Sequence, residues 1–302
     1  MYIDYLDVYL PDKSMSIDDL IGSINLEDPD ALSNFSINRD IGSIYKIDIK
    51  NEEEIFENLL KKYLESKNLN GSEIDYILYV QSDALDNKLN IIYNLQHKLN
   101  LINCQVMSVI QGCSGTLNAM NIASALIGSG SAKRVLILSR IFTENDIDRV
   151  IGPTILSDGL GLMEITESGG FFEIVDFMGK TNGGINENNF FLDGNPAKIV
   201  SIGTKLMKKV LAKNSMNIND IPIIVPLSTT KEIWELHCEM FGCSIDKVFL
   251  GNLYDGGHVG AVDTIRNLKT VIDKRLIKKG DNIILYGIGF GTSWGVFLLK
   301  YL

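Results

Sequence analysis

The residue whose surroundings most favour chemistry is Cys113, in the run VIQGCSGTLNAMNIASALIGSG. An apolar, strand-like stretch precedes this cysteine, and a long helical pattern follows it directly. A thiol at a helix start lies near unpaired backbone N–H groups and the positive end of the helix dipole, which favour the thiolate. Gly112 and Gly115 would let the chain turn sharply and leave the sulfur uncrowded. The pattern predicts a nucleophile, and the alternative is a buried cysteine acting as a small hydrophobic residue.

A second segment carries a histidine that could activate this thiol. His258 lies in LYDGGHVGAVD, five residues before Asp263. If His258 lies in a loop and Asp263 in the first turn of the next helix, the carboxylate can hold one imidazole nitrogen while the other faces the sulfur. Asp255 is an alternative partner, and Asp263 could also be only a favourable charge at a helix start. A loop histidine bound by backbone groups is the structural alternative for His258.

The other histidines and cysteines form no recognisable site. His97 and His237 lie in helical patterns away from any motif, and we expect both to be structural. No metal-ligand spacing or CxxC pair links the four cysteines, at positions 104, 113, 238 and 243. We therefore expect reduced thiols and no metal.

Composition limits the class of partner. The chain has 302 residues, 45% of them hydrophobic and 22% charged, with a net charge of −10. This charge argues against nucleic-acid binding. The longest apolar runs are too short to span a membrane, and the first residues do not resemble a signal peptide, so we expect no membrane anchor and a cytoplasmic location. One basic run has helical spacing and is either a solvated helix face or a docking surface for an acidic partner, and its residues are Lys205, Lys208, Lys209 and Lys213.

The elements that must position these residues alternate between strand and helix. Near-continuous apolar runs predict strands at 75–82, 134–140, 160–167, 171–179, 221–228, 246–253, 282–289 and 294–302. Helical patterns lie at 51–67, 88–99, 114–129, 196–213, 229–241 and 262–276. The order predicts an α/β fold.

A weak internal repeat suggests how the thiol and the imidazole meet. The helix from about 114 leads into the strand RVLILSR, and the helix from about 262 leads into the strand NIILYGIG. Two similar halves, at 1–168 and 169–302, would pack about a pseudo-twofold axis. The start of the first helix, with Cys113, could then face the start of the second, with His258.

Three motifs in order resemble the thiolase-fold ketoacyl synthase III family: QGCSG, SDGLGLMEI and GIGFGTSWGVFLL. The resemblance implies a five-layered αβαβα fold made of two similar halves, and usually a homodimer. It also implies that Cys113 accepts an acyl group from coenzyme A or a carrier protein. The oxyanion would be held by the backbone N–H groups of Cys113 and Phe290, with Gly289 and Gly291 shaping the second turn.

Two departures from the family pattern alter the expected reaction. Leu227-Ser228-Thr229-Thr230 stands where ordinary members carry His-Gln-Ala-Asn, and the position of a further family Asn falls at or near Gly257. In the ordinary enzymes that His and Asn stabilise the enolate formed by decarboxylation. Leucine and glycine side chains cannot donate a hydrogen bond, and loss of one such donor typically costs about 100-fold or more. We expect little or no decarboxylative condensation.

The remaining set, Cys113 with His258 and Asp263, is similar to a side branch of the family that has a Cys or Ser nucleophile and a His-x4-Asp element. Members of that branch prime carrier-bound synthesis or transfer acyl groups in secondary metabolism. We therefore expect an acyltransferase without a cofactor beyond its thioester substrate. Carbon–carbon condensation, or priming by an unusual site, is the first alternative, and a non-catalytic partner subunit is the second.

The segment ALSNFSINRDIG bears on the acyl donor. In relatives that use coenzyme A, the corresponding segment often places a Trp and an Arg around the adenine, whereas here Arg39 is its only basic residue and Trp is absent. The difference favours delivery by an acyl carrier protein, with the lysine-bearing helix as its dock.

Overall fold

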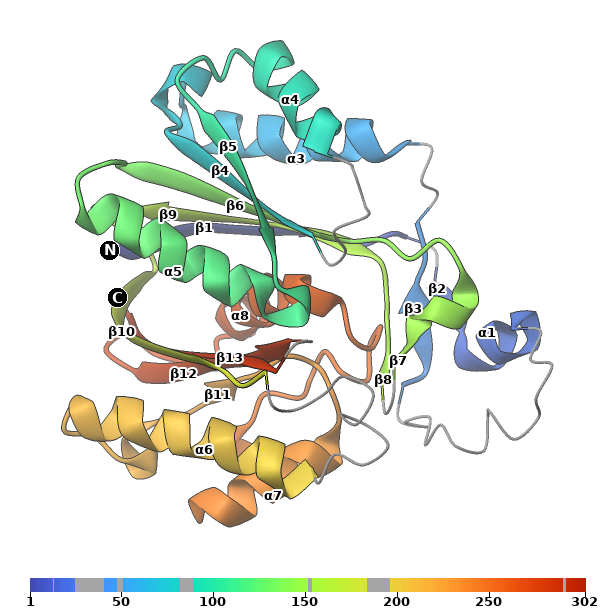
Figure 1. The fold of residues 1–302 in the computed structure, drawn as a ribbon, viewed down its shortest axis with the longest axis vertical. Coiled ribbons are helices and arrows are strands. Elements are labelled where there is room, and N and C mark those ends of the chain that lie inside the picture. The colour runs from blue at the N-terminus through green and yellow to red at the C-terminus, as the bar shows by residue number, and fades with distance from the viewer. Residues whose placement is uncertain are drawn as a thin grey trace.

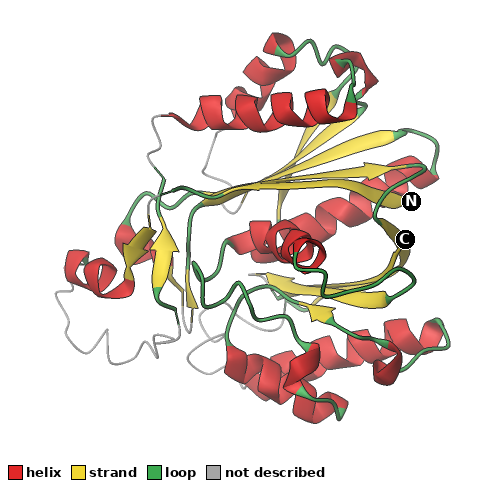
Figure 2. Cartoon of the chain, turned by 180° about the vertical axis from the view of Figure 1, so that it is seen from behind, coloured by secondary structure: helices red, strands yellow, loops and turns green. Residues whose placement is uncertain are grey.

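The computed structural model describes residues 1–12, 14–24, 41–47, 51–81, 89–151, 154–183, 196–289 and 292–302. Its elements stack in five layers, helix, sheet, helix, sheet and helix (Figure 1 and Figure 2). The outer helices are α3 (Glu52–Lys67) and α4 (Leu89–Lys98) on one side and α6 (Pro196–Lys213) and α7 (Lys231–Phe241) on the other. The middle layer holds α5 (Gly115–Gly128) and α8 (Asp263–Asp273). The predicted five-layered αβαβα thiolase-like architecture is confirmed.

The two sheet layers have related strand orders. The first runs β5-β4-β6-β9-β1, with bounds Gln105–Ile110, Tyr76–Gln81, Arg134–Ile141, Gly159–Thr166 and Tyr2–Tyr9. The second runs β11-β12-β13-β10, with bounds Ile224–Val225, Asn282–Gly289, Ser293–Tyr301 and Phe172–Thr181. The pairs Tyr2↔Glu173 and Ile3↔Phe172 join β1 to β10. Each half thus places its first strand at the junction, although the predicted boundary at residue 168 stays a prediction.

Smaller elements lie beside the layers, near the N-terminal end of α8 (Figure 1). They are β2 (Ser14–Ser16), α1 (Ile17–Ser23), β3 (Ser43–Tyr45), β7 (Val150–Ile151) and β8 (Thr154–Ile155). In the part of the chain that the structure describes, no helix is long and apolar enough to cross a membrane.

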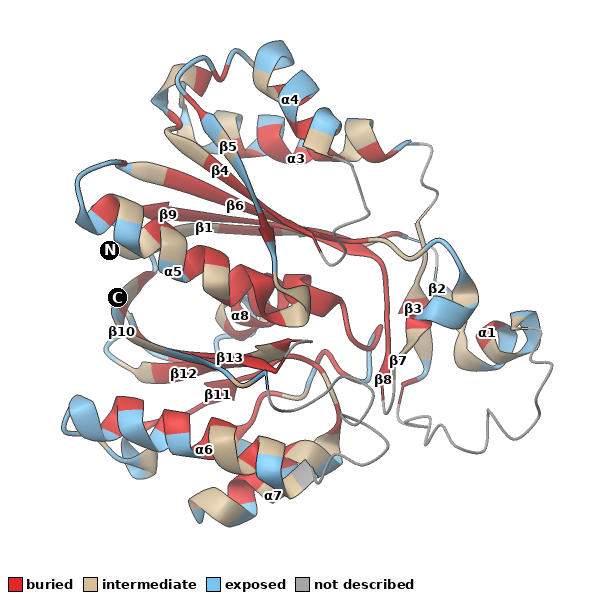
Figure 3. Ribbon diagram, in the orientation of Figure 1, coloured by how far each residue is buried: buried red, intermediate tan, exposed pale blue. Residues whose placement is uncertain are grey.

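Apolar side chains on nearly every face explain why α5 lies in the middle layer. Its buried residues include Leu117, Met120 and Ile127 together with the small Ala119 and Ala123. A helix that is apolar all round is stable only when it is covered on all sides. Figure 3 shows this layer coloured mainly as buried. In contrast, α8 buries polar residues in its first turns, which points to a role beyond packing.

The strand predicted at 246–253 is wrong. Only Val248 makes a β-bridge, to Ile224, and the chain then turns away from the sheet edge. The run is apolar because Val248, Phe249 and Leu253 are buried in three different core clusters. The strand predicted at 221–228 is shortened to β11, and the prediction missed β1 and β5.

Candidate active site

Cys113 lies in a tight turn between β5 and α5. A single turn of 3-10 helix, Gly112–Ser114, carries it, and Gly112 has the left-handed φ of 51° that this turn requires. The Ser114 hydroxyl donates to the Gln111 carbonyl at 3.0 Å and fixes the turn. The Cys113 thiol is free and half-buried, so the alternative of a fully buried cysteine does not apply.

His258 and Asp263 meet this thiol from the other half of the molecule. His258 Nε2 lies 3.1 Å from Cys113 Sγ, and His258 Nδ1 lies 2.5 Å from Asp263 Oδ2. Both side chains are buried, with 3% of His258 and 0% of Asp263 exposed. The candidate nucleophile, base and orienting acid therefore lie within hydrogen-bond distance of one another in that order.

The starts of the two middle helices hold these groups together. The Thr116 hydroxyl, in the first turn of α5, donates to the Ala261 carbonyl at 2.7 Å, in the turn before α8. A Cβ at Gly115 would lie 2.5 Å from the Val80 side chain, so α5 packs closely on β4. The helix starts that the repeat predicted to face one another are thus in direct contact.

The Asp263 carboxylate is held by backbone as well as by the imidazole. Its Oδ2 also accepts from the Ser228 N–H at 2.8 Å, and its Oδ1 accepts from the Val259 N–H at 3.2 Å. Three donors on a buried carboxylate restrict its rotation. Asp255, the other partner considered, accepts from the Tyr45 hydroxyl at 3.1 Å instead. The structure therefore brings Asp263 rather than Asp255 to His258.

The surroundings of His258 favour its charged form. Burial by itself would lower the pKa of His258, but the neighbouring Cys113 sulfur and Asp263 carboxylate outweigh burial and raise that pKa to about 10. At neutral pH the His258 imidazole is thus favoured in its charged form, between the Cys113 sulfur and the Asp263 carboxylate.

The main chain of His258 is fixed by the segment before β9. The Ser157 N–H donates to the His258 carbonyl at 2.8 Å, and the His258 N–H donates to the Ile155 carbonyl at 3.1 Å. The Ser157 hydroxyl donates to the Gly256 carbonyl at 2.5 Å. Sequence reasoning used SDGLGLMEI as a family motif but did not identify Ser157 as a support for the catalytic loop.

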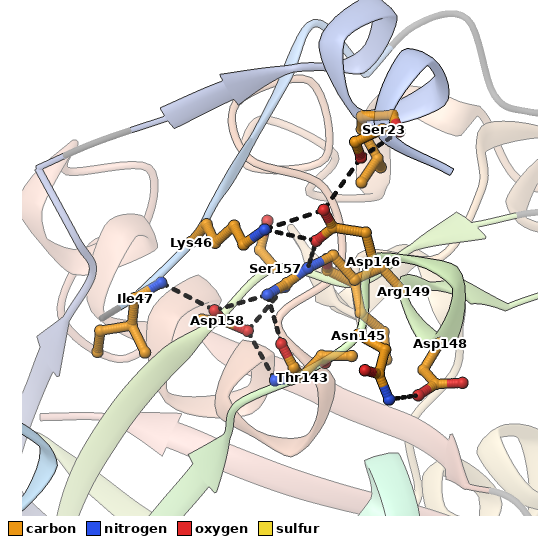
Figure 4. Close-up of polar contacts among 12 residues, drawn as sticks. Ser23, Lys46, Ile47, Thr143, Asn145, Asp146, Asp148, Arg149, Ser157 and Asp158 are labelled. Carbon is orange, nitrogen blue, oxygen red and sulfur yellow. Dashed lines mark hydrogen bonds and ion pairs between the residues drawn. The ribbon is translucent and has the colours of Figure 1, made fainter. Parts of the chain in front are cut away.

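A buried ion pair beside Ser157 anchors that segment in turn (Figure 4). Asp158 accepts from the two Nη atoms of Arg149 at 2.7 and 2.9 Å, and from the backbone N–H groups of Ile47 and Thr143 at 2.9 and 3.0 Å. The network continues through Asp146 to Lys46 and Ser23. Full pairing makes this buried charge tolerable and joins three chain segments behind the site.

The second expected oxyanion donor, Phe290, lies outside the described residues, as does Gly291. Gly289 ends β12 against the turn that carries the nucleophile. A Cβ there would lie 2.5 Å from the Gln111 carbonyl oxygen and 2.8 Å from the Ser114 backbone nitrogen. Glycine is therefore required at 289 for the close approach of β12 to the Cys113 turn.

Leu227 and Gly257, which stand where the family pattern has its His and Asn, offer no side-chain donor. Leu227 is buried, and its Cγ would lie 3.1 Å from a Cβ at Gly287. Gly257 has φ of 59°, and a Cβ there would lie 2.9 Å from the Ile155 carbonyl oxygen. The loop is thus built around a glycine at this position.

Two lysines of the predicted basic face are engaged elsewhere. Lys208 donates to the Met240 carbonyl at 2.7 Å and lies over the Phe241 ring, and Lys213 pairs with Asp176 at 2.7 Å. Lys205 and Lys209 are exposed, one turn apart on α6. The docking surface itself stays a prediction.

The other predicted structural positions contain no second cluster of ligands. His237 accepts or donates a hydrogen bond at 2.8 Å with the Thr204 hydroxyl and stacks on Trp234. Burial lowers the pKa of His237 to about 3. His97 lies in the last turn of α4. Within the described ranges, no group of three or more His, Cys, Asp or Glu side chains could hold a metal ion.

Known proteins with similar sequences are named as acyl-carrier-protein synthases. The family model described as 3-oxoacyl-[acyl-carrier-protein] synthase III C terminal matches residues 211–301. The β-ketoacyl-[acyl-carrier-protein] synthase III of Neisseria meningitidis serogroup A is 26% identical over 318 residues, which cover 97% of each chain.

Solved structures match the whole fold. The 3-oxoacyl-[acyl-carrier-protein] synthase III of Aquifex aeolicus superposes with a TM-score of 0.80 at 22% identity, over 99% of each chain. The acyltransferase ChlB3 superposes with a TM-score of 0.84 at 18% identity, over 100% of this chain and 97% of that one. The protein therefore has the thiolase fold. The sequence matches add a similarity to proteins named β-ketoacyl-[acyl-carrier-protein] synthase III, in keeping with the resemblance of the three motifs to that family.

Proposed function

We propose that this protein is an acyltransferase that forms an acyl-Cys113 thioester and passes the acyl group to an acceptor. The observation that carries the proposal is the line of contacts from Cys113 Sγ through His258 to Asp263, at 3.1 and 2.5 Å. A thiol with a base and an orienting acid is suited to taking an acyl group from a thioester and releasing it again.

The proposed reaction has two steps. The Cys113 sulfur attacks the carbonyl carbon of the donor thioester, and the tetrahedral intermediate collapses as the donor thiol leaves with the proton from His258. The acceptor then attacks acyl-Cys113, while His258 removes the acceptor proton and the Cys113 sulfur leaves. Asp263 keeps Nδ1 of the imidazole oriented and stabilises its positive charge in both steps.

The surroundings of the thiol favour transfer over decarboxylative condensation. Condensation with a malonyl thioester forms an enolate that needs donors beside the carbonyl oxygen. Leu227 and Gly257 provide none. Because structures named as a synthase and as an acyltransferase both share this fold, the fold alone does not select between the two reactions.

The two other readings fit the site less well. Carbon–carbon condensation or priming would require a carbon nucleophile that needs no decarboxylation. A non-catalytic partner subunit would not require the Cys113 thiol, the His258 imidazole and the Asp263 carboxylate to stay within hydrogen-bond distance. The contacts among Cys113, His258 and Asp263 therefore support an active enzyme.

The proposed acyl donor is an acyl carrier protein, as the name of the Neisseria relative suggests. Carrier proteins of this kind are acidic, so the exposed Lys205 and Lys209 on α6 are the proposed contacts. We also propose a homodimer formed through the edge of β5, with a cytoplasmic role in secondary metabolism. The reaction as proposed uses no cofactor beyond the thioester.

Product analysis tests the proposal. Purified protein is incubated with acyl carrier donors and, separately, acyl-CoA donors, in the presence of malonyl carrier protein or of mixed oxygen, nitrogen and sulfur acceptors. We expect acyl esters, amides or thioesters and no carbon–carbon product. A 3-oxoacyl product formed by the wild type and not by Cys113→Ala would replace acyl transfer with condensation.

A further inference from the structure

Asn267 is a polar residue that is fully buried in α8, one turn after Asp263. Among the described residues, its hydrogen bonds reach none of Cys113, His258 and Asp263. Its Nδ2 donates to the Pro226 carbonyl at 2.7 Å and to the Ser228 hydroxyl at 3.1 Å. These two acceptors flank Leu227, in the segment whose Ser228 N–H donates to Asp263 Oδ2 at 2.8 Å. The amide thus fixes the segment that fixes the carboxylate.

We propose that Asn267 is a positioning residue, which orients the Asp263 carboxylate toward His258 by holding the Ser228 N–H in place. The inference rests on the proposed function, because it assigns Asn267 to the triad of the acyltransferase.

The direction of the Asn267 amide is set by its neighbours. The Thr270 hydroxyl donates to the Arg266 carbonyl at 2.8 Å, so its oxygen is an acceptor for the Asn252 Nδ2, 2.9 Å away. The other Asn252 N–H donates to Asn267 Oδ1, also at 2.9 Å. With its oxygen occupied by this donor, Asn267 must turn its Nδ2 toward the 226–228 segment.

These contacts form a continuous hydrogen-bond network. Ser228 takes part through its hydroxyl on one side and its backbone N–H on the other. In order, the network joins Thr270, Asn252, Asn267, Ser228, Asp263, His258 and Cys113. Each of its members is buried except Thr270 and the half-buried Cys113, and every contact pairs a donor with an acceptor. In a buried site such a network selects a single arrangement, because an alternative rotamer leaves a polar group unpaired. Asp263 consequently has one orientation, in which Oδ2 serves both Ser228 and His258.

Loss of this arrangement should weaken the Asp263–His258 contact. A carboxylate with fewer donors is more basic, but a hydrogen bond loses strength steeply when its distance and angle drift. We expect the poorer hydrogen-bond geometry to outweigh the higher basicity of the carboxylate, so that the Asp263–His258 contact becomes weaker. The imidazolium would then be less stabilised, and the Cys113 sulfur would be less reactive at neutral pH.

Alkylation of Cys113 by iodoacetamide measures this effect without any acyl donor. The rate is followed against pH by peptide mass, which separates Cys113 from the other three cysteines. Asn267→Leu keeps the branching at Cγ and removes the hydrogen bonds. We expect it to lower the alkylation rate at neutral pH about tenfold. The pH profile should also move toward that of an ordinary thiol, whose pKa is about 8.5.

Thr264→Val is the matched control. Thr264 lies on α8 between Asp263 and Asn267 and is equally buried, but its hydroxyl has no hydrogen-bond partner among the described residues. Its variant should keep the wild-type alkylation profile. If Asn267→Leu lowers the melting temperature and leaves the alkylation profile unchanged, Asn267 is only a packing residue and the proposal is overturned.

Asn252→Ala keeps the test decisive should Asn267→Leu not fold. It removes the donor that orients Asn267, so we expect the same change in profile at smaller amplitude, and an unchanged profile would contradict the proposal. Because alkylation needs no substrate, failure of acyl loading with an altered profile would refute the acyltransferase function while leaving the positioning role intact.

Discussion

The two carboxylate oxygens of Asp263 accept three hydrogen bonds, and these contacts indicate what the residue does in the site. The His258 imidazole and the Ser228 N–H share Oδ2, while the Val259 N–H takes Oδ1. If Asp263 were only a favourable charge at the start of α8, it would not need to be fully buried or to accept from two backbone N–H groups. The residue is therefore tied both to the imidazole and to the loops on either side of it.

Asp263→Asn tests this role at the residue scale. An amide must turn its NH2 group toward one of the backbone N–H donors, and it cannot carry the charge that stabilises the imidazolium. We expect acyl transfer to fall about 100-fold or more and stability to fall by about 1–3 kcal/mol. Steady-state kinetics and urea unfolding measure the two effects, and near-wild-type transfer rates in a folded variant would rule Asp263 out as the orienting acid.

Loops rather than regular elements carry most of the support for the site, and this explains what sequence could predict. Cys113 was predictable from its glycine-flanked turn, and His258 with Asp263 from their spacing and the repeat. Ser157 and Ser228 were not, because each contacts the site through its backbone N–H group, whose direction no residue type reveals, and uses its hydroxyl only to support a neighbouring loop. The predicted strand at 246–253 failed for a related reason, since apolar residues there fill separate clusters instead of one sheet face.

The loop that carries His258 requires glycine at 257. Asparagine tolerates a positive φ, but a Cβ at 257 would lie 2.9 Å from the Ile155 carbonyl, which already accepts from the His258 N–H. We expect Gly257→Asn to cost about 1–3 kcal/mol in urea unfolding. Adding Leu227→His to this variant should still give no condensation. The new Cβ at 257 would displace the loop that carries His258, and the two introduced donors would not be brought to the substrate carbonyl.

Gly130→Asn is the control for the loop experiment. Gly130 also has a positive φ, of 74°, but a Cβ there meets nothing within 4 Å. Its substitution should change stability by less than about 0.5 kcal/mol. Equal losses at the two positions would show that φ, not the contact with Ile155, decides the cost.

The packing of α6 on α7 should depend on pH through His237. The pKa of His237 is lowered to about 3 in the folded protein, against about 6.5 when unfolded. Between these values the unfolded chain binds the extra proton, so stability falls as pH falls below about 6.5. At pH 5 the loss is about 2 kcal/mol. His237→Asn keeps a partner for Thr204 without titrating, and should lose about 2 kcal/mol less over this interval in urea unfolding. Equal pH dependence in both proteins would contradict a neutral, buried His237.

At the scale of the whole molecule, β5 is the sheet edge that needs covering. It ends the order of the first sheet, and Figure 3 colours part of it as exposed. Its exposed side chains include Met107 and Ile110, at 44% and 46% exposure. Long apolar sheet edges pair readily with other chains. A second copy pairing through β5 would cover this edge and place the two Cys113 turns near the interface.

Met107→Lys should therefore weaken the dimer. A charge on each copy would face its symmetry mate across the proposed interface, so we expect the mass in sedimentation velocity to shift from about twice the chain mass toward the monomer. Val175→Lys, at a 40% exposed apolar position on β10, should leave the assembly unchanged. A wild-type protein that is monomeric at micromolar concentration would contradict the assembly proposal.

The central claim, that Cys113 carries an acyl group, is tested most directly by the intact mass of the protein after incubation with acyl carrier and acyl-CoA donors. We predict an increase equal to one acyl group, located by peptide mapping on the segment with Cys113, slower to appear in His258→Ala and absent in Cys113→Ala. No adduct with any donor of a broad panel, or an adduct that persists in Cys113→Ala, would contradict the account.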